Sequence, residues 1–107
     1  GIARLEMSPS PFTPNGDGVN DETHIDFEVL NLGAPREARV RIYSLDGRVR
    51  WEQQWLVGSG QQSIPWHGMD DTGTLVPPGI YICQVDVDVD DRSSNHTTAA
   101  RLVYVAY

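Results

Sequence analysis

The stretch Gly79-Ile-Tyr-Ile-Cys-Gln-Val-Asp-Val-Asp-Val-Asp90 decides the fold, because its side chains alternate in kind along the chain. Successive side chains of an extended strand point to opposite faces of a sheet, so a period of two separates a core face from an outer face. The core face consists of Tyr81, Cys83, Val85, Val87 and Val89. The other face carries Asp86 and Asp88, which we interpret as a face open to water. The stretch predicts one long strand of a half-buried sheet.

The same alternation recurs along the rest of the chain. Ser44-Leu-Asp-Gly47 has the residues of a hairpin turn, and Arg48–Leu56 returns from it with Val49, Trp51 and Trp55 as inward residues. We predict strands at Ala3–Met7, Thr23–Leu30, Glu37–Tyr43, Arg48–Leu56, Gln62–Trp66, Gly79–Asp90 and Thr97–Tyr107, with loops at Val57–Gly60 and Asp90–Asn95. About seven short strands joined by turns predict an all-β chain, a single Ig-like antiparallel β-sandwich domain over residues 1–107.

Composition restricts the functions open to this domain. Its formal net charge of −7 argues against partners such as nucleic acid or anionic membrane surfaces, which need basic patches. No apolar stretch reaches the length of a membrane span. No signal peptide is visible at Gly1, so we expect a domain taken from a larger exported protein. The single cysteine, Cys83, excludes an internal disulfide, and we expect a buried, inert thiol.

The loop TPNGDGVNDE (Thr13–Glu22) gathers carboxylates, amides and glycines at the start of the chain. Ca²⁺ prefers six to eight hard oxygens from carboxylates, amides, backbone carbonyls and water. If Gly18 is aligned with the glycine of an EF-hand loop, the ligand positions fall on alternate residues. The candidate ligands are then Thr13, Asn15, Asp17, the carbonyl of Val19, and Asp21. The loop therefore predicts a structural calcium site.

Two positions depart from the EF-hand pattern. Thr13 stands where that loop begins with aspartate, and His24 stands where it ends with a bidentate glutamate. A missing carboxylate would have to come from Asp70, Asp71 or Glu22. The alternative interpretation is a solvated turn without a metal, because Asn-Gly and Asp-Gly pairs are also strong turn formers.

Two motifs carry a resemblance to known families. The segment SPSPFTPNGDGVND (Ser8–Asp21) resembles the opening of C-terminal domains of secreted bacterial proteins, including gliding-motility-type, type IX secretion domains, which often begin F-T/S-P-N-G-D-G-V-N-D. The segments VRIYSLDGRV (Val40–Val49) and WHGMDDTGTLVPPGIY (Trp66–Tyr81) resemble the FlgD-like Ig domain. The acidic loop is also similar to the calcium loops of thrombospondin type-3 repeats. Together these similarities extend over nearly the whole chain.

The resemblance implies a seven-stranded β-sandwich in an exported bacterial protein that is secreted or held at the cell surface. It implies a non-catalytic accessory or C-terminal module for spacing, docking, or cell-surface attachment and sorting, with a protein or cell-surface partner. One difference counts against a type IX sorting role. The hairpin reads YSLDG (Tyr43–Gly47), where gliding-motility domains typically carry F-N-R-W-G.

The second motif also has a direct physical interpretation. Trp66 is expected to close the edge of the sandwich, where a large aromatic ring fills the space between two sheets. Tyr81, near the start of its strand, is expected to bond its hydroxyl back to a corner of the chain, as in Ig-type sandwiches.

The residues give no indication of an enzyme. Catalysis needs a nucleophile, a base and an orienting group gathered in one pocket. His24, His67 and His96 lie far apart in the sequence, and their spacing gives no reason to expect that they meet. We expect each histidine at the surface and predict no enzymatic activity.

The alternative function is that of a carbohydrate-binding module of a secreted glycoside-active enzyme, with polysaccharide as partner. Such modules present exposed aromatic rings beside polar side chains, and Trp51, Trp55 and Tyr43 lie on or near one hairpin. Because Trp51 and Trp55 share the parity of Val49, we expect both tryptophans to face the core. Two exposed tryptophans on one sheet face would instead favour sugar binding.

Overall fold

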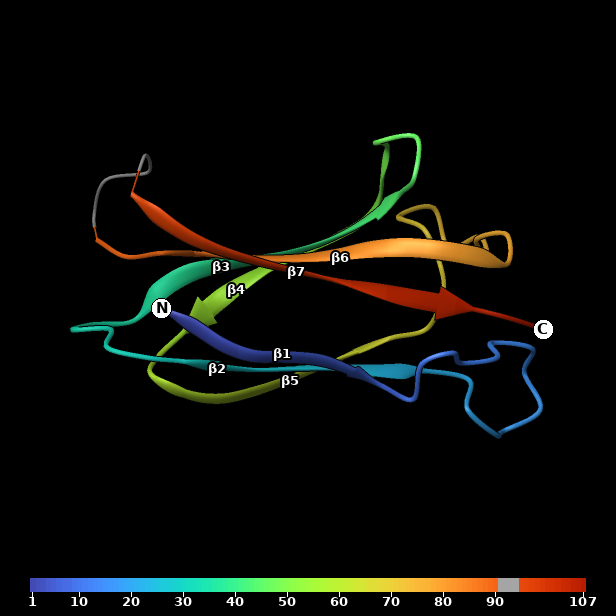
Figure 1. Cartoon of the computed structure of the whole chain (residues 1–107), viewed down its shortest axis with the longest axis horizontal. Coiled ribbons are helices and arrows are strands. Elements are labelled where there is room, and N and C mark those ends of the chain that lie inside the picture. The colour runs from blue at the N-terminus through green and yellow to red at the C-terminus, as the bar shows by residue number, and fades with distance from the viewer. Residues whose placement is uncertain (91–94) are drawn as a thin grey trace.

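The computed structural model describes residues 1–90 and 95–107 and consists of two sheets packed face to face (Figure 1). The three-stranded sheet has the order β1-β2-β5, with β1 at Ile2–Ser8, β2 at Thr23–Val29 and β5 at Gly60–Trp66. The four-stranded sheet has the order β4-β3-β6-β7, with β4 at Val49–Val57, β3 at Arg36–Ser44, β6 at Gly79–Asp88 and β7 at His96–Val105. The pairings between these seven strands are antiparallel, and the predicted all-β sandwich is confirmed. No helix that could cross a membrane occurs in the described ranges.

The core is built by the alternation that the sequence shows. The inward residues of the central strands are almost completely buried: Ile25, Phe27 and Val29 on β2, Ala38, Val40 and Ile42 on β3, and Tyr81, Cys83, Val85 and Val87 on β6. Side chains from the two inner faces interdigitate, as in other aligned sandwiches. Burial raises the pKa of the Cys83 thiol to about 12, so the predicted inert, buried cysteine is confirmed.

Three predicted assignments need correction at the ends of strands. Val49 is exposed, because a bulge between Ile42 and Tyr43 pairs Val49 with Tyr43 on the outer face. Val57, predicted in a loop, is buried, because β4 continues to this residue. Val89 is exposed, because β6 already ends at Asp88. Residues 91–94 of the predicted loop Asp90–Asn95 lie outside the described residues.

Trp66 closes one end of the sandwich, as predicted. Its indole is 1% exposed and donates from Nε1 to the carbonyl of Met69 at 2.9 Å. Its ring lies against three other aromatic rings, with centroid distances of 5.5 Å to Phe12, 6.0 Å to Tyr81 and 6.3 Å to Trp51. The Tyr81 hydroxyl donates to the carbonyl of Pro77 at 2.6 Å, which confirms the expected corner.

Asp86 is buried, so the interpretation of its face as open to water is wrong at this position. Arg39 on the neighbouring strand β3 donates from Nη2 to Asp86 at 2.7 Å and to Asp88 at 2.6 Å. On the other side, β7 contributes the Thr98 hydroxyl, 2.7 Å from Asp86, and the ring of His96. The register explains the contact, because Arg39 and Thr98 lie directly opposite Asp86 on the two flanking strands.

The same contacts determine how Asp86 titrates. Burial by itself would raise the pKa of the carboxyl group, but hydrogen bonds from Arg39, Thr98 and His96 lower it further than burial raises it. A carboxylate with a lowered folded-state pKa stabilises the protein above its unfolded-state pKa, and that stabilisation is lost as the pH falls through the folded-state pKa.

We predict that Asp86→Ala lowers the free energy of unfolding by about 3 kcal/mol at pH 7, because Arg39 then loses its main buried partner. The gap between wild type and variant should begin to close near the unfolded-state pKa of about 4 and should close further as the pH falls through the lowered folded-state pKa of Asp86. Urea unfolding at neutral and acid pH measures both effects. Asp88→Ala is the matched control and should cost less, because Arg39 keeps Asp86. Equal unfolding free energies for wild type and Asp86→Ala at pH 7 would contradict the prediction.

Candidate functional site

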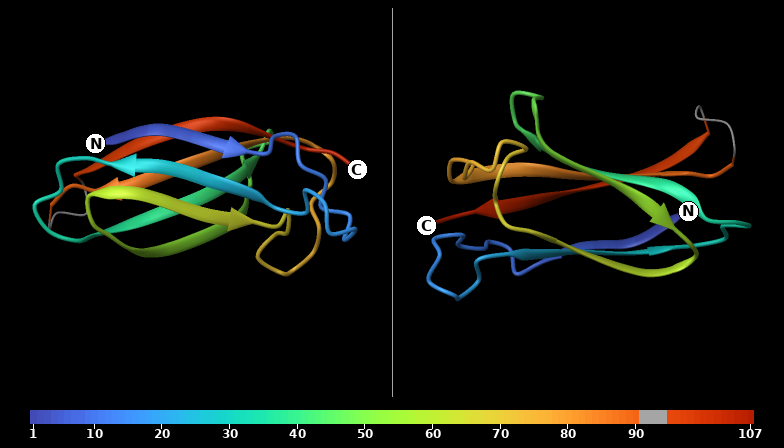
Figure 2. Two further views of the ribbon diagram at one scale, coloured as in Figure 1. Left: turned by 90° about the horizontal axis from the view of Figure 1, so that it is seen from below. Right: turned by 180° about the vertical axis from the view of Figure 1, so that it is seen from behind.

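The acidic loop and the loop that follows β5 lie at the same end of the sandwich. Both views in Figure 2 place the loop at residues 13–22 beside the loop at residues 67–78, next to the C-terminus. Phe12 directly precedes the acidic loop; it is buried and pairs with Val105 at the end of β7. The Phe12 amide donates to Tyr104 at 3.1 Å, and the Phe12 carbonyl accepts from Ala106 at 3.0 Å. The loop therefore starts from a fixed point of the core.

Asp21 organises the interior of the acidic loop. One oxygen of its carboxylate accepts the backbone N–H of Gly16 at 2.9 Å, and the other accepts that of Gly18 at 2.7 Å. Both glycines have positive φ angles, 80° and 83°, which turn their amides toward a common point. The Thr13 amide closes the loop by donating to the carbonyl of Asn20 at 2.8 Å.

The remaining candidate ligands also lie in this closed loop. The side-chain oxygen of Asn15 accepts the Asp17 amide at 3.1 Å, and a carboxylate oxygen of Asp17 accepts the Val19 amide at 2.8 Å. The Thr13 hydroxyl donates to the Val19 carbonyl at 3.4 Å. The structure thus brings together all five residues that the sequence pattern proposes.

In the described part of the chain, the side chains of Asp70 and Asp71 accept hydrogen bonds from residues outside the acidic loop. Asp70 accepts the Thr72 hydroxyl at 2.6 Å and the Thr74 amide at 3.0 Å, and these bonds, led by the Thr72 hydroxyl, lower the pKa of its carboxyl group. Asp71 accepts the Glu52 amide at 3.2 Å and its own amide donates to Arg50, which covers the free edge of β4. Their additional role as calcium ligands stays a prediction.

The acidic loop carries oxygen atoms of the kinds that bind hard cations. Among the residues that the structure describes, no three His, Cys, Asp or Glu side chains are grouped to hold a metal ion. A cation at the loop would therefore use the amide of Asn15 and the carbonyl of Val19 besides carboxylates. Such a mixed set of oxygens suits calcium, which accepts carbonyls and water readily.

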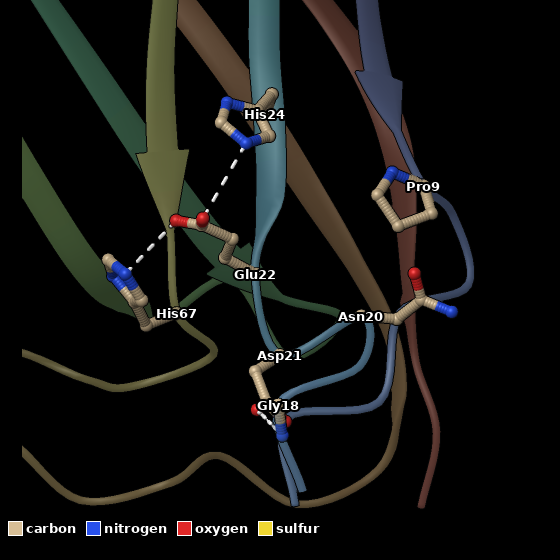
Figure 3. A pocket seen from close by; sticks show the side chains of 7 residues that line it. All are labelled: Pro9, Gly18, Asn20, Asp21, Glu22, His24 and His67. Atoms are coloured by element: carbon tan, nitrogen blue, oxygen red, sulfur yellow. Dashed lines mark hydrogen bonds and ion pairs between the residues drawn. The ribbon is translucent and has the colours of Figure 1, made fainter. Parts of the chain in front are cut away.

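Glu22 lies outside this loop interior and faces two histidines (Figure 3). One of its carboxylate oxygens is 3.1 Å from Nε2 of His67 and the other is 3.7 Å from Nε2 of His24. The three residues line a hollow of about 430 Å³ together with Pro9, Gly18, Asn20 and Asp21. All three side chains are substantially exposed to solvent, which agrees with the surface positions predicted for both histidines.

Sequence spacing gave no reason for His24 and His67 to meet, but the strand register provides one. Thr23 pairs with Trp66 at the end of the β2–β5 ladder, so continuing the antiparallel register places Glu22 opposite His67. The pairing of β2 with β5 would therefore have predicted that Glu22 meets His67, whereas residue spacing within the sequence does not.

Gly68 connects the loop after β5 to the acidic loop. Its φ angle is +76°, and a Cβ added there would lie 2.8 Å from Cγ of Pro14 and 3.4 Å from Cζ of Phe12. No side chain fits between these groups without displacing them. The two loops are thus packed against each other directly behind the candidate cation site.

Trp51 and Trp55 face inward, as predicted. Both rings are partly buried against the core, where Trp51 lies on Trp66 and Trp55 lies 6.5 Å from Phe27 between ring centroids. Tyr43 points to the outer face and donates from its hydroxyl to Gln84 at 3.2 Å. The two tryptophans therefore do not form an exposed platform, and sugar binding stays an alternative that these contacts do not favour.

An exposed apolar surface covers one end of the outer face of the four-stranded sheet. It consists of Ile80, Ile82, Leu102 and Tyr104, and we call it the outer apolar face. Ile80 pairs with Tyr104 and Ile82 with Leu102, so the four side chains form a compact block across β6 and β7. Ile80, Leu102 and Tyr104 are between 40% and 49% exposed. The face borders Ser10 and Pro11, which directly precede the acidic loop.

Comparison with solved structures defines the class of this fold. The chain superposes on latent PorU from Porphyromonas gingivalis with a TM-score of 0.75 at 16% identity, covering 95% of this chain and 9% of that one. It superposes on FlgD from P. aeruginosa with a TM-score of 0.60 at 22% identity, covering 78% of this chain and 61% of that one. The chain spans less than two thirds of either protein, and both matches show the sandwich fold. No curated protein matches its sequence.

Comparison of the sequence with family models shows the family of this chain. The family model CHU_C, described as a type IX secretion signal domain, matches residues 7–105, and the chain belongs to this family. It is therefore a non-catalytic secretion module of the kind found in proteins exported to the cell surface or secreted. The match extends across the hairpin YSLDG, so the inference from this hairpin against a type IX role was wrong.

We predict that Gly68→Ala destabilises the protein more than Gly73→Ala. Both glycines have positive φ angles, so each substitution should cost about 1–2 kcal/mol in backbone strain. Only Gly68 adds a steric overlap, worth about 1–3 kcal/mol more, because no atom lies within 4 Å of a Cβ at Gly73. Thermal and urea unfolding of the two variants measure the difference. Equal losses would show that the two loops are not packed as described.

Proposed function

We propose that this domain directs its parent protein through type IX secretion and then serves as a docking or cell-surface attachment module, stabilised by calcium outside the cell. The observation that carries the proposal is the family match over residues 7–105, which extends from the end of β1 to the end of β7. The sorting signal is then the folded sandwich as a whole, because the matched residues include strands of both sheets.

Calcium would act on the acidic loop by neutralising its crowded charge. Residues 13–22 contain three carboxylates and no basic side chain. Asn15, Asp17, Asp21 and the Val19 carbonyl would be the main ligands, with Thr13 as a further oxygen and Asp70, Asp71 or Glu22 as sources of an additional carboxylate. Bound calcium would link these residues to each other and thereby hold the loop against the core at Phe12.

The stabilisation follows from linkage. A ligand that binds only the folded state stabilises it by about 4 kcal/mol when its concentration is 1,000 times the dissociation constant. A site of micromolar affinity reaches that ratio in millimolar calcium. A small domain has a total stability of roughly 5–15 kcal/mol, so calcium would supply a large part of it.

The outer apolar face is the surface on which we place the contact with the export apparatus. Its side chains are not needed to join the two sheets, because the inner faces form the core. Ser10 and Pro11, in the segment that leads into the acidic loop, border this surface on one side, and Arg101 borders it on another. The expected partner is a protein with an apolar contact surface, because the exposed side chains of this face would then be buried in the contact.

We predict that calcium raises the melting temperature of the wild-type domain above the value in excess EGTA. Asp17→Asn should lose most of this gain while melting like the wild type in EGTA, since the asparagine oxygen can still accept the Val19 amide. Asp46→Asn is the matched control, because Asp46 accepts the Arg48 amide in a similar turn far from the loop, and it should keep the full gain. Superimposable wild-type melting curves with calcium and with EGTA would remove the calcium site from the proposal.

We predict that Leu102→Glu reduces export of a reporter protein that carries this domain by about tenfold in a bacterium with type IX secretion, because the change places a charge within the outer apolar face. The amount of reporter outside the cell and on its surface, relative to the total, gives the measurement.

Leu45→Glu provides the control for the export experiment, since Leu45 is also exposed but lies in the hairpin turn after β3. Both variants should retain the wild-type melting temperature. Export of Leu102→Glu at the level of Leu45→Glu would exclude the outer apolar face as the recognised surface. Failure of the wild-type fusion to leave the cell would contradict the sorting function itself.

A further inference from the structure

The acidic loop contains two peptide bonds of a chemically fragile kind. Asn15-Gly16 and Asp17-Gly18 each place a glycine after a residue with a side-chain carbonyl carbon. The backbone nitrogen of such a glycine can attack that carbon, because no Cβ of the glycine obstructs the approach. The product is a five-membered succinimide. In most exposed loops this reaction modifies Asn-Gly and Asp-Gly pairs over time.

In this loop both attacking nitrogens are occupied by a single carboxylate. The Gly16 N–H donates to one oxygen of Asp21 at 2.9 Å, and the Gly18 N–H donates to the other at 2.7 Å. A hydrogen bond to a charged acceptor is stronger than one to a neutral acceptor, and it also fixes the direction of the N–H bond. An amide held in this way gives up its proton less readily than one exposed to water.

The two side chains under attack are also restrained. The Asn15 oxygen accepts the amide of Asp17 at 3.1 Å, and an Asp17 oxygen accepts the amide of Val19 at 2.8 Å. Each side chain is therefore bonded to the second amide after it, while the first amide after it is bonded to Asp21. Closing the ring would break both kinds of hydrogen bond.

We infer that Asp21 protects the loop from covalent modification by suppressing succinimide formation at Asn15 and at Asp17. At Asn15, the unprotected reaction would join Gly16 nitrogen to the side-chain carbon, release ammonia, and then add water to give aspartate or isoaspartate. At Asp17, the protonated carboxyl group would lose water on ring closure and regain it on hydrolysis, which gives isoaspartate with no change in mass. Isoaspartate at either position would lengthen the backbone and displace the two glycine amides that Asp21 now holds together.

This inference is independent of the proposed function, because the hydrogen bonds of Asp21 are present in the loop itself. The chain also contains a reference site for the test. Asp46-Gly47 is a third pair of the same kind, and its glycine amide donates to the Ser44 carbonyl at 3.0 Å instead of to Asp21. Loss of the Asp21 carboxylate should leave this pair unchanged.

The test is to store wild type and Asp21→Ala below their melting temperatures, at mildly alkaline pH for the deamidation of Asn15 and at mildly acidic pH for the isomerisation of Asp17, and to follow both products by peptide mapping with mass spectrometry. The expected result in EGTA is an increase of about tenfold in the rate of Asn15 deamidation, with a parallel increase in Asp17 isomerisation. Glu22→Ala is the matched control, since Glu22 is the adjacent acid and bonds to neither glycine, and it should react like the wild type. Asp21→Asn keeps one acceptor oxygen without the charge and should react at an intermediate rate. This variant replaces Asp21→Ala in the test if Asp21→Ala does not fold.

Three results would overturn the inference. Unchanged rates in Asp21→Ala would show that the hydrogen bonds do not protect the glycine amides. Slower modification in Asp21→Ala than in wild type would show that Asp21 acts as a general base for ring closure and does not protect the glycine amides. An equal acceleration at Asp46-Gly47 would assign the effect to general loosening of the fold.

Discussion

The burial of Trp66 between the two sheets is the contact on which the rest of this end of the molecule depends. Its ring lies against Phe12, from which the acidic loop departs, and against Tyr81, which begins the long strand β6. Its N–H fixes the Met69 carbonyl in the loop after β5. Because Gly68 leaves no space beside Pro14, the two loops and the aromatic cluster form one packed unit. The candidate cation site thus rests on the hydrophobic core and not on a free loop.

Most of the fold could be predicted from the sequence, because alternation is a local property that each strand carries by itself. The buried faces of β2, β3 and β6 follow it closely. The errors arose where a neighbour decides the outcome. The bulge at Tyr43 turns Val49 outward, and Arg39 makes the burial of Asp86 favourable although an isolated aspartate would remain in water. Likewise, the closed loop at Thr13–Asp21 follows from its own residues, whereas the meeting of His24 and His67 at Glu22 depends on pairing between β2 and β5.

The proposed functions of sorting and calcium binding belong to different parts of one scaffold. Membership in the type IX secretion signal family concerns nearly the whole sandwich, whereas the acidic loop is a short segment held at one end of it. Strands β6 and β7 of the sandwich form the outer apolar face, and the segment that leads into the acidic loop borders it.

Cys83 has a consequence for a domain that leaves the cell. An exported chain passes from a reducing compartment into oxidising surroundings, where accessible thiols are joined by disulfide bonds. The only thiol of this domain is fully covered by the core, and its pKa of about 12 leaves almost no reactive thiolate at neutral pH. Once folded, the domain can therefore cross this redox boundary without oxidative cross-linking and without any enzyme that forms or rearranges disulfide bonds.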